Sequence, residues 1–378
     1  MAELNGTAIK PKKPVWKRII RLILILLLIL VFLAVLLIGY LTFAEYRPAE
    51  EEVLEVAGFA DLGEGSVPTK NLEVDKAITV LTWNIGYGAL GDNANFFMDG
   101  GTDVITADED RVNSNIANIS SQIKYQNPDI IMLQEVDIDS DRSYRLDERT
   151  RIIGNFSDKA YTFATNFKVQ YVPYPWPPIG RVWSGLVTMS NYNIDRATRV
   201  QLPVPFSWPV RIANLKRGLA IHRMPVEGSD KELVTINLHL EAYDNGEGKI
   251  AQTEALRKIM QEEYDKGNYV LVGGDFNQTF SSIDNSMYPL DPNLWQCGDI
   301  DTSTFGDEWQ FIMDNAVPTC RSLDRPYVDA DKENFQYYMI DGYIVSDNIE
   351  VVEVETKDIG FVYSDHNPVV MKIKLKQQ

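Results

Sequence analysis

The feature that most constrains this chain is an uncharged apolar run over residues 22–41, LILILLLILVFLAVLLIGYL. As an α-helix this run would be about 30 Å long, the thickness of the hydrocarbon core of a bilayer. A cleavable signal peptide is the alternative, because residues 42–44 (Thr-Phe-Ala) weakly resemble a cleavage site. The apolar part of a signal peptide usually spans only about 7–15 residues. The run therefore favours an uncleaved signal anchor, and we predict a transmembrane helix over residues 22–44.

Charge differs sharply between the two sides of this run. Residues 1–21 carry six basic side chains and one acidic side chain, a net charge of +5, whereas the whole chain carries −18. The remainder therefore carries −18 − 5 = −23. Basic residues on the N-terminal flank predict a single-pass protein with a short cytoplasmic head and an extracytoplasmic acidic body. So acidic a body is not expected to hold nucleic acid by charge alone.

Beyond the run we expect a tether and one large domain. Residues 45–76 are acidic, with scattered Gly and Pro and no sustained period. This composition predicts a flexible tether with an r.m.s. span of about 30 Å, which would let the body touch its own membrane. A hydrophobic content of 45% and an aromatic content of 11% supply a substantial core. We assign residues 77–378 to a single catalytic domain.

Short apolar runs alternate with helical patterns in this domain. Buried strands are predicted at AITVLTWNI and DIIMLQEV, with a helix between them that has Asp108 as N-cap and Pro128 as stop signal. A second helix is predicted at KIAQTEALRKIMQEEYDKG, ending at Gly267. Strands outnumber helices, and several neighbouring strands have no helix between them. The pattern predicts a mixed α/β body with packed sheets, not a simple doubly wound sheet.

The two cysteines, Cys297 and Cys320, leave two alternatives open. A disulfide would suit an extracytoplasmic body, closing a loop of about 20 residues and stabilising it by roughly 3 kcal/mol. A pair of free thiols fits the sequence equally well. Neither cysteine lies in a Cys-x-x-Cys or Cys/His pattern, so a zinc site is not expected.

Polar side chains recur where the predicted strands end. A single Asn or Asp at a strand end is usually a turn or cap residue. Six strand ends that carry acids, amides and histidines are better explained by one shared site. The eight residues are Asn84 in TWNIG, Glu135 in LQEV, His239 in NLHLEA, Asp275 and Asn277 in GGDFNQ, Asp341 in MIDGY, and Asp365 and His366 in YSDHNP.

These residue types indicate a class of reaction. Carboxylate and amide oxygens form the hard ligand set that suits magnesium. Histidines oriented by carboxylates can donate toward a developing oxyanion, and an aspartate can deprotonate a water molecule. The set predicts metal-assisted hydrolysis of a phosphate ester. The chain shows neither a Gly-x-Ser-x-Gly elbow nor a Walker loop, so we expect neither acyl transfer nor a nucleotide cofactor.

The order of these motifs resembles that of the endonuclease/exonuclease/phosphatase superfamily, which has the deoxyribonuclease-I-like, exonuclease-III-like fold. The motifs span residues 81–370, and GDFN and SDH are specific in combination. The resemblance implies a metal-dependent phosphoric ester hydrolase. It also implies a four-layered α/β sandwich, two packed mixed β-sheets flanked by helices, with the active site at one end.

The resemblance implies a metal site as well. Glu135 would be the main ligand, with Asn84 and Asp365 nearby, and Mg²⁺ would be the ion, with Mn²⁺ as the alternative. MIDGYIVS has Gly342 where inositol polyphosphate phosphatases and deoxyribonuclease-I-type enzymes tend to have an arginine. This motif is more similar to the sphingomyelinase-like and exonuclease-III-like branches.

Catalytic roles follow from the same resemblance. Asp275 would orient or deprotonate the attacking water, and Asn277 would hold the phosphate or the nucleophile. Asp341 would orient His366, which together with His239 would stabilise phosphoryl oxygens or assist the leaving group.

Three further residues are candidates for substrate contact. Tyr174 and Trp176 lie in the aromatic, proline-rich stretch YVPYPWPPIGRVW, which FSWPV at residues 206–210 echoes. Such loops either pack on the body or form an aromatic rim at a membrane or substrate. Arg217 precedes the predicted strand GLAIHRM and could touch an anion, although an ordinary surface arginine is the alternative. We interpret His222, in that strand, as structural.

We therefore expect a membrane-anchored, extracytoplasmic, divalent-metal-dependent phosphohydrolase that cleaves a phosphodiester, with a lipid or lipid-linked phosphate favoured. A surface-tethered nuclease, with nucleic acid as substrate only, is the first alternative. A surface binding module without catalysis is the second.

Overall fold

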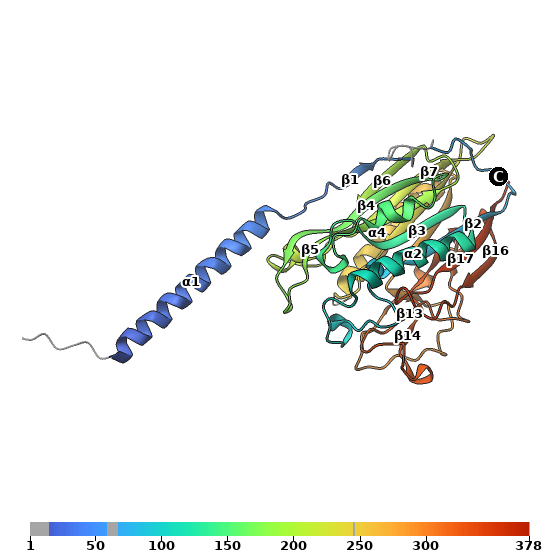
Figure 1. Ribbon diagram of the computed structural model, residues 1–378. Coiled ribbons are helices and arrows are strands. Elements are labelled where there is room, and N and C mark those ends of the chain that lie inside the picture. The colour runs from blue at the N-terminus through green and yellow to red at the C-terminus, as the bar shows by residue number, and fades with distance from the viewer. Residues whose placement is uncertain (1–14, 59–66, 245, 378) are drawn as a thin grey trace, which may run out of the picture. The chain divides into compact units, whose positions relative to one another are not determined.

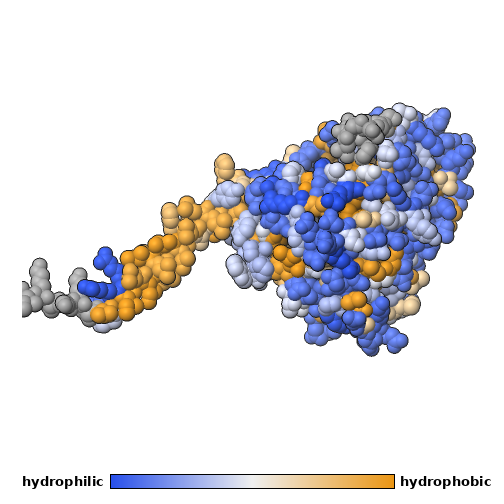
Figure 2. Space-filling view, viewed as in Figure 1, coloured by the Kyte–Doolittle hydropathy of each residue, from blue (hydrophilic) through white to orange (hydrophobic). Residues whose placement is uncertain are grey.

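The computed structural model describes residues 15–58, 67–244 and 246–377, and the chain forms two compact units, residues 1–45 and 46–378. The first unit contains helix α1 (Val15–Phe43), which begins seven residues before the predicted span. Among the described residues it is the single helix long and apolar enough to cross a membrane. Figure 2 shows apolar side chains along the visible face of α1. Residues 1–14 of the predicted basic head lie outside the described residues.

The second unit contains two large mixed sheets (Figure 1). The six-stranded sheet has the order β16 (Ile349–Thr356), β17 (Val369–Leu375), β2 (Ile78–Asn84), β3 (Ile130–Asp137), β5 (Gly180–Ser190) and β4 (Ala160–Val172). The seven-stranded sheet has the order β1 (Glu51–Leu54), β6 (Arg196–Gln201), β7 (Gly218–Pro225), β8 (Glu232–His239), β9 (Tyr269–Asp275), β15 (Asp341–Ser346) and β12 (Trp309–Ile312). Two short pairs complete the strands: β10 (Gln278–Phe280) with β11 (Gly298–Ile300), and β13 (Cys320–Arg321) with β14 (Tyr337–Tyr338).

A β-α-β unit lies at the centre of each sheet. Strands β2 and β3 are parallel and are joined through α2 (Glu109–Gln126). Strands β8 and β9 are parallel and are joined through α4 (Glu247–Asp265). Parallel neighbours finish at the same edge of their sheet. We call the edge where these four strands finish the carboxyl edge; it is marked by Asn84, Asp137, His239 and Asp275.

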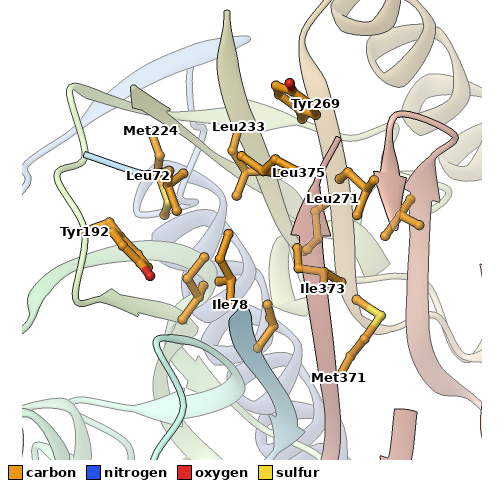
Figure 3. Close-up of a cluster of buried hydrophobic side chains, with 14 of the residues drawn as sticks. Leu72, Ile78, Tyr192, Met224, Leu233, Tyr269, Leu271, Met371, Ile373 and Leu375 are labelled. Carbon is orange, nitrogen blue, oxygen red and sulfur yellow. The ribbon is translucent and has the colours of Figure 1, made fainter. Parts of the chain in front are cut away.

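The core between the two sheets draws apolar side chains from both of them, among them Ile78, Leu233, Leu271 and Met371 (Figure 3). Helix α2 buries Ile116, with other apolar residues at helical spacing, in a second cluster that also contains residues of β2 and β3. Helix α4 packs in a third cluster with β8 and β9. The short helix α3 (Glu148–Ile153) contributes to the α2 cluster. The layers are therefore α–β–β–α, which confirms the predicted four-layered sandwich.

The predicted signals for α2 are also found in the structure. The Asp108 side chain accepts a hydrogen bond from the backbone N–H of Arg111, which satisfies one of the free donors at the start of the helix. The helix ends at Gln126, and its C-cap Asn127 adopts a left-handed conformation immediately before Pro128.

The structure differs from the prediction of a flexible tether over residues 45–76. Residues Glu51–Leu54 form β1, which pairs with β6. This pairing provides hydrogen-bond partners for the backbone N–H and C=O groups on the outer side of β6. Leu72 is fully buried in the core between the sheets. The compact unit accordingly starts at Tyr46, well before residue 77. Residues 59–66 of the predicted tether lie outside the described residues.

The two cysteines are free thiols in the structure, Cys320 buried and Cys297 half-buried.

Candidate active site

The eight residues predicted for the site lie together at the carboxyl edge, where each strand leaves the sandwich. Asn84, His239 and Asp275 are the last residues of β2, β8 and β9, and Asp341 is the first residue of β15. The other four residues lie at or close to strand ends as well: Glu135 near the end of β3, Asn277 just after β9, and Asp365 and His366 just before β17.

Asn84 joins the two sheets through its amide group. Its Nδ2 donates to Glu135 Oε1 at 3.1 Å and to Asp275 Oδ2 at 2.9 Å. Its Oδ1 accepts from the backbone N–H of Gly86 at 3.0 Å. Asn84 was predicted close to the metal. In the structure its nitrogen, and not its oxygen, faces the two carboxylates.

Glu135 reaches the site through an irregularity in β3. The pairing of β3 with β5 shifts between Leu133 and Val136, and Glu135 has a φ of 56°. A non-glycine residue in the left-handed region is unfavourable and persists where the surroundings fix it, commonly at functional sites. The bulge re-aims the Glu135 side chain toward Asn84.

Asp275 is buried at the centre of the cluster. Its Oδ1 accepts from the backbone N–H of Asn277 at 2.9 Å, and its Oδ2 accepts from Asn84. Burial, followed by the negative charge of Asp341, raises the pKa of Asp275 to about 6. Asn277 is itself fixed, because its Nδ2 donates to the carbonyl of Leu240 at 2.8 Å.

His366 and Asp341 form a buried pair. His366 Nδ1 lies 2.8 Å from Asp341 Oδ2, and the backbone N–H of Asp341 donates to Thr319 Oγ1 at 3.1 Å. Burial acts to lower the pKa of His366, but Asp341 and the other acidic groups around the ring together outweigh burial, and the pKa is raised well above its ordinary value. The His366 ring is therefore a cation whose Nε2 lies 3.8 Å from Asp275 Oδ2.

His239 faces the same oxygen of Asp275, with its Nε2 at 3.4 Å. Burial lowers the pKa of His239 well below its ordinary value, and the positive charges of Arg217 and His366 add to the effect. Arg217 Nη1 donates to the carbonyl of His239 at 3.0 Å, and its Nε donates to Glu241 Oε2 at 3.4 Å.

Arg217 therefore lies behind the site. Its side chain is only 3% exposed, so an ordinary surface position does not describe it, and the anion contact stays a prediction. The strand register explains this: Gly218 begins β7, next to β8, and Arg217 turns inward toward the end of β8. The arginine supports His239 from within. Its partner Glu241, two residues after His239, was not predicted.

The donors at this site fit a hard divalent cation. Burial raises the pKa of Asp365 to about 6; His366 opposes this rise and the negative charge of Glu135 adds to it. With Asp275 and Asp341 also buried, carboxylates outnumber the His366 cation. Such a surplus of buried carboxylate oxygens favours a bound Mg²⁺ or Mn²⁺. The sets Asp275–Asp341–His366 and Cys320–Asp365–His366 also bring ligand atoms within 4.8 Å, but Nδ1 of His366 is already bonded to Asp341.

Tyr174 and Trp176 are not part of this cluster. They lie on the connection between β4 and β5, where Tyr174 is 72% and Trp176 89% exposed. Tyr174 makes an edge contact with Phe97, at 6.3 Å between ring centroids.

The segment that carries Phe97 also brings an unpredicted acid to the carboxyl edge. Asp99 Oδ1 accepts from the hydroxyl of Tyr243 at 3.1 Å. Burial, followed by the negative charge of Asp365, raises the pKa of Asp99 to about 7. This irregular segment has no periodicity, so its contact with Tyr243, 144 residues further along, left no signal in the sequence.

His222 lies apart from the catalytic cluster, inside β7. Its Nε2 lies 2.7 Å from Thr162 Oγ1, and the side chain is fully buried. Burial lowers the pKa of His222 to about 4, so the ring is neutral and packs in the core. The interpretation of His222 as a structural residue fits this position.

Comparison with known proteins gives a consistent result. The endonuclease/exonuclease/phosphatase family matches residues 81–332. None of the curated proteins searched matches the chain. An endonuclease/exonuclease/phosphatase structure from Beutenbergia cavernae is 19% identical, with a TM-score of 0.53 over 80% of this chain and 72% of that one.

Two structures from Bacteroides are similar to the same extent. The endonuclease/exonuclease/phosphatase of Bacteroides vulgatus is 13% identical, with a TM-score of 0.53 over 80% of this chain and 100% of that one. A family protein of Bacteroides thetaiotaomicron is 15% identical, with a TM-score of 0.51 over 80% of this chain and 96% of that one. At these identities the likeness shows a shared fold.

Proposed function

This chain belongs to the endonuclease/exonuclease/phosphatase family of metal-dependent phosphoester hydrolases, and from that premise we propose that it is a membrane-anchored phosphodiesterase acting on lipid or lipid-linked phosphate. The observation that carries the proposal is that Nε2 of His239 and Nε2 of His366 lie 3.4 and 3.8 Å from the same atom, Asp275 Oδ2. A buried carboxylate close to two histidines can take a proton from water beside groups that bind a phosphoryl oxygen.

We assign Glu135 and Asp365 to the metal, with Asn84 positioning Glu135. A divalent ion held there would polarise a phosphoryl oxygen of the substrate. Mg²⁺ is the proposed ion and Mn²⁺ its alternative, because both prefer carboxylate oxygens.

The protein side chains can then move the protons. The Asp275 carboxylate accepts a proton from water as the water oxygen attacks phosphorus, and Asn277 holds Asp275 in place. As the phosphorus–oxygen ester bond breaks, the His366 cation can donate its Nε2 proton to the leaving alkoxide, while Asp341 stabilises the charged ring beforehand. His239 is neutral and can donate a hydrogen bond to a phosphoryl oxygen without a competing proton transfer.

A lipid substrate and an extracytoplasmic location rest on the N-terminal region. Helix α1 is long and apolar enough to cross a membrane, and basic residues precede its uncharged part. This charge pattern favours a cytoplasmic N-terminus and a body on the other side of the membrane. An enzyme held at a bilayer meets phospholipids at a far higher local concentration than soluble esters.

The test uses the full chain in detergent micelles with Mg²⁺. It is assayed on bis(p-nitrophenyl) phosphate, on mixed phospholipid and on plasmid DNA, before and after EDTA. We expect headgroup release that EDTA abolishes, and loss of that release in Glu135→Gln but not in Glu254→Gln, an exposed glutamate on α4. DNA nicking without headgroup release would instead identify a tethered nuclease. No metal-dependent turnover on any of the three substrates would identify a binding module.

A further inference from the structure

We propose that the carboxyl edge of the body rests on the bilayer that holds α1, so that the active site opens toward lipid headgroups. The inference rests on the proposed function in one respect, because it requires α1 to be a membrane anchor. It adds an interaction surface, formed by the connections β4–β5 and β6–β7, and names a lipid bilayer as its partner.

Strand register places the first of these connections beyond the site. Strand β3 reaches the carboxyl edge at Asp137, which pairs with Ser184 of β5. From that level β5 and β4 continue outward through the pair Lys168–Trp183 to the pair Val172–Gly180. The connection that carries Trp176 therefore projects past the carboxyl edge, on the side of Glu135.

The second connection lies at the same edge. Strand β8 finishes at His239, and its neighbour β7, which runs in the opposite direction, begins at Gly218. Gly218 pairs with Gln201, the last residue of β6. The connection between β6 and β7 therefore starts and finishes at the carboxyl edge, and it exposes Trp208 and Val210.

The chain also enters the body at this edge. Glu51, the first residue of β1, pairs with Val200 near the end of β6. The hydroxyl of Tyr46 donates to Glu52 at 3.3 Å, and Lys168 of β4 lies over the Tyr46 ring. Helix α1 ends at Phe43, so only three residue steps, at most about 11 Å of chain, separate it from Tyr46. The chain therefore passes from the end of α1 to the carboxyl edge of the body within a few residues.

The two connections themselves carry no acidic side chain. The chain has 54 acidic residues, yet residues 159–194 and 196–226, which include both connections, contain none. The same two stretches carry Arg211 and Arg181 among their basic residues, and Arg181 pairs with Asp139 at 2.9 Å. Tryptophan and tyrosine favour the membrane interface, and basic residues favour anionic headgroups. The two connections therefore present aromatic and basic side chains to a bilayer, while the acids of this edge belong to the site and to the chain entry.

The experiment adds one tryptophan at either edge of the full chain. Tyr174→Trp places it on the β4–β5 connection. Tyr125→Trp places it at the end of α2, which leads into the start of β3 at the opposite edge, where Tyr125 is 82% exposed. Both chains are reconstituted in vesicles of phosphatidylcholine and phosphatidylglycerol whose acyl chains are brominated near the glycerol, and tryptophan fluorescence is compared with unbrominated vesicles.

We expect bromine to quench most of the fluorescence added by Tyr174→Trp and little of that added by Tyr125→Trp, and Trp176→Phe to lower the quenched fraction. Equal quenching of the two added tryptophans overturns the inference, while headgroup release would still support the proposed hydrolase. Quenching without any turnover supports the docking surface and contradicts the proposed catalysis. A chain that does not float with the vesicles contradicts both, because α1 is then not an anchor.

Discussion

The two histidines of the site have similar positions relative to Asp275, but the side chains that neighbour them carry opposite charges. His239 and His366 both place Nε2 within 4 Å of Asp275 Oδ2. Behind His366 is the carboxylate of Asp341, and behind His239 is the guanidinium of Arg217. Burial lowers the pKa of both rings. At His239 the charge of Arg217 adds to this lowering, whereas at His366 the negative charge of Asp341, with other acidic groups, reverses it, so the His366 ring is charged and the His239 ring is neutral.

This difference assigns the two rings different tasks. A charged imidazole can give a proton to a leaving oxygen, whereas a neutral one can hold a phosphoryl oxygen without competing for the proton on Asp275. Similar positions alone would not separate the roles. The residues behind the rings do so, and changing them tests the comparison.

The largest effect is expected from His366→Ala. This change removes the proposed proton donor and leaves Asp341 buried without its partner. We expect kcat on the soluble diester to fall by about 10³-fold, within the range that general acid catalysis supplies. Circular dichroism and thermal unfolding check that the fold is retained. A variant that keeps more than a tenth of the wild-type kcat would remove His366 from the mechanism.

Asp341→Asn should give the next largest loss. The substituted side chain keeps its shape but loses the negative charge that holds the pKa of His366 high. We expect a drop in kcat of about 10²-fold at neutral pH and an alkaline limb of the pH–rate profile displaced to lower pH. Asp230→Asn, at an exposed position in the β7–β8 turn, is the matched control. An unmoved limb would mean that Asp341 only positions the ring.

Arg217→Lys should have a smaller effect, because it keeps the positive charge beside His239. It still removes the guanidinium that donates hydrogen bonds both to Glu241 and to the His239 carbonyl. We expect a loss in kcat of about tenfold, since lysine is a poor substitute at a forked site. Arg217→Gln removes the charge as well, so the pKa of His239 should rise and the acid limb of the profile should move to higher pH. If both variants show the same limb, the arginine acts only through position.

The residues around the two histidines differ in how well the sequence predicted them. The site residues at the strand ends could be predicted, because buried apolar runs that finish in acids, amides and histidines have few purely structural explanations. The resemblance in motif order then implied the pairing of Asp341 with His366. Arg217 was harder to place, because nothing local distinguishes a buried arginine at the start of a strand from an exposed one.

Long-range pairing explains most of what the sequence did not reveal. The acidic composition of residues 45–76 indicated a free tether, but the open edge of β6 recruits Glu51–Leu54 as a strand. The φ of Glu135 depends on a bulge that exists only when β3 meets β5. Asp99 reaches Tyr243 through an irregular segment. In each case the conformation of the segment is set by a distant part of the chain that it contacts, and not by the segment's own sequence.

Changing the third histidine, His222, should have the smallest effect on catalysis. His222 also allows the effect of burial on a histidine pKa to be measured without a neighbouring charge. Burial alone accounts for the lowering of the pKa of His222 to about 4, whereas for His239 the charge of Arg217 adds to burial. An unfolded histidine titrates near 6.5, so the stability linked to His222 is fully present above about pH 6.5 and is lost as the pH falls toward 4. The shift corresponds to roughly 3 kcal/mol over that window.

His222→Gln should therefore flatten the fall in thermal stability between pH 6.5 and 4 and leave kcat near its wild-type value. The measurement is the unfolding temperature of the full chain in micelles across this range, with His239→Gln in parallel. Because His239 is buried as well, its variant should also flatten the curve, but it alone should lower kcat. If His222→Gln unfolds with the same pH dependence as the wild type, folding does not lower the pKa of His222, and burial without a neighbouring charge is not enough to keep a ring neutral in this protein.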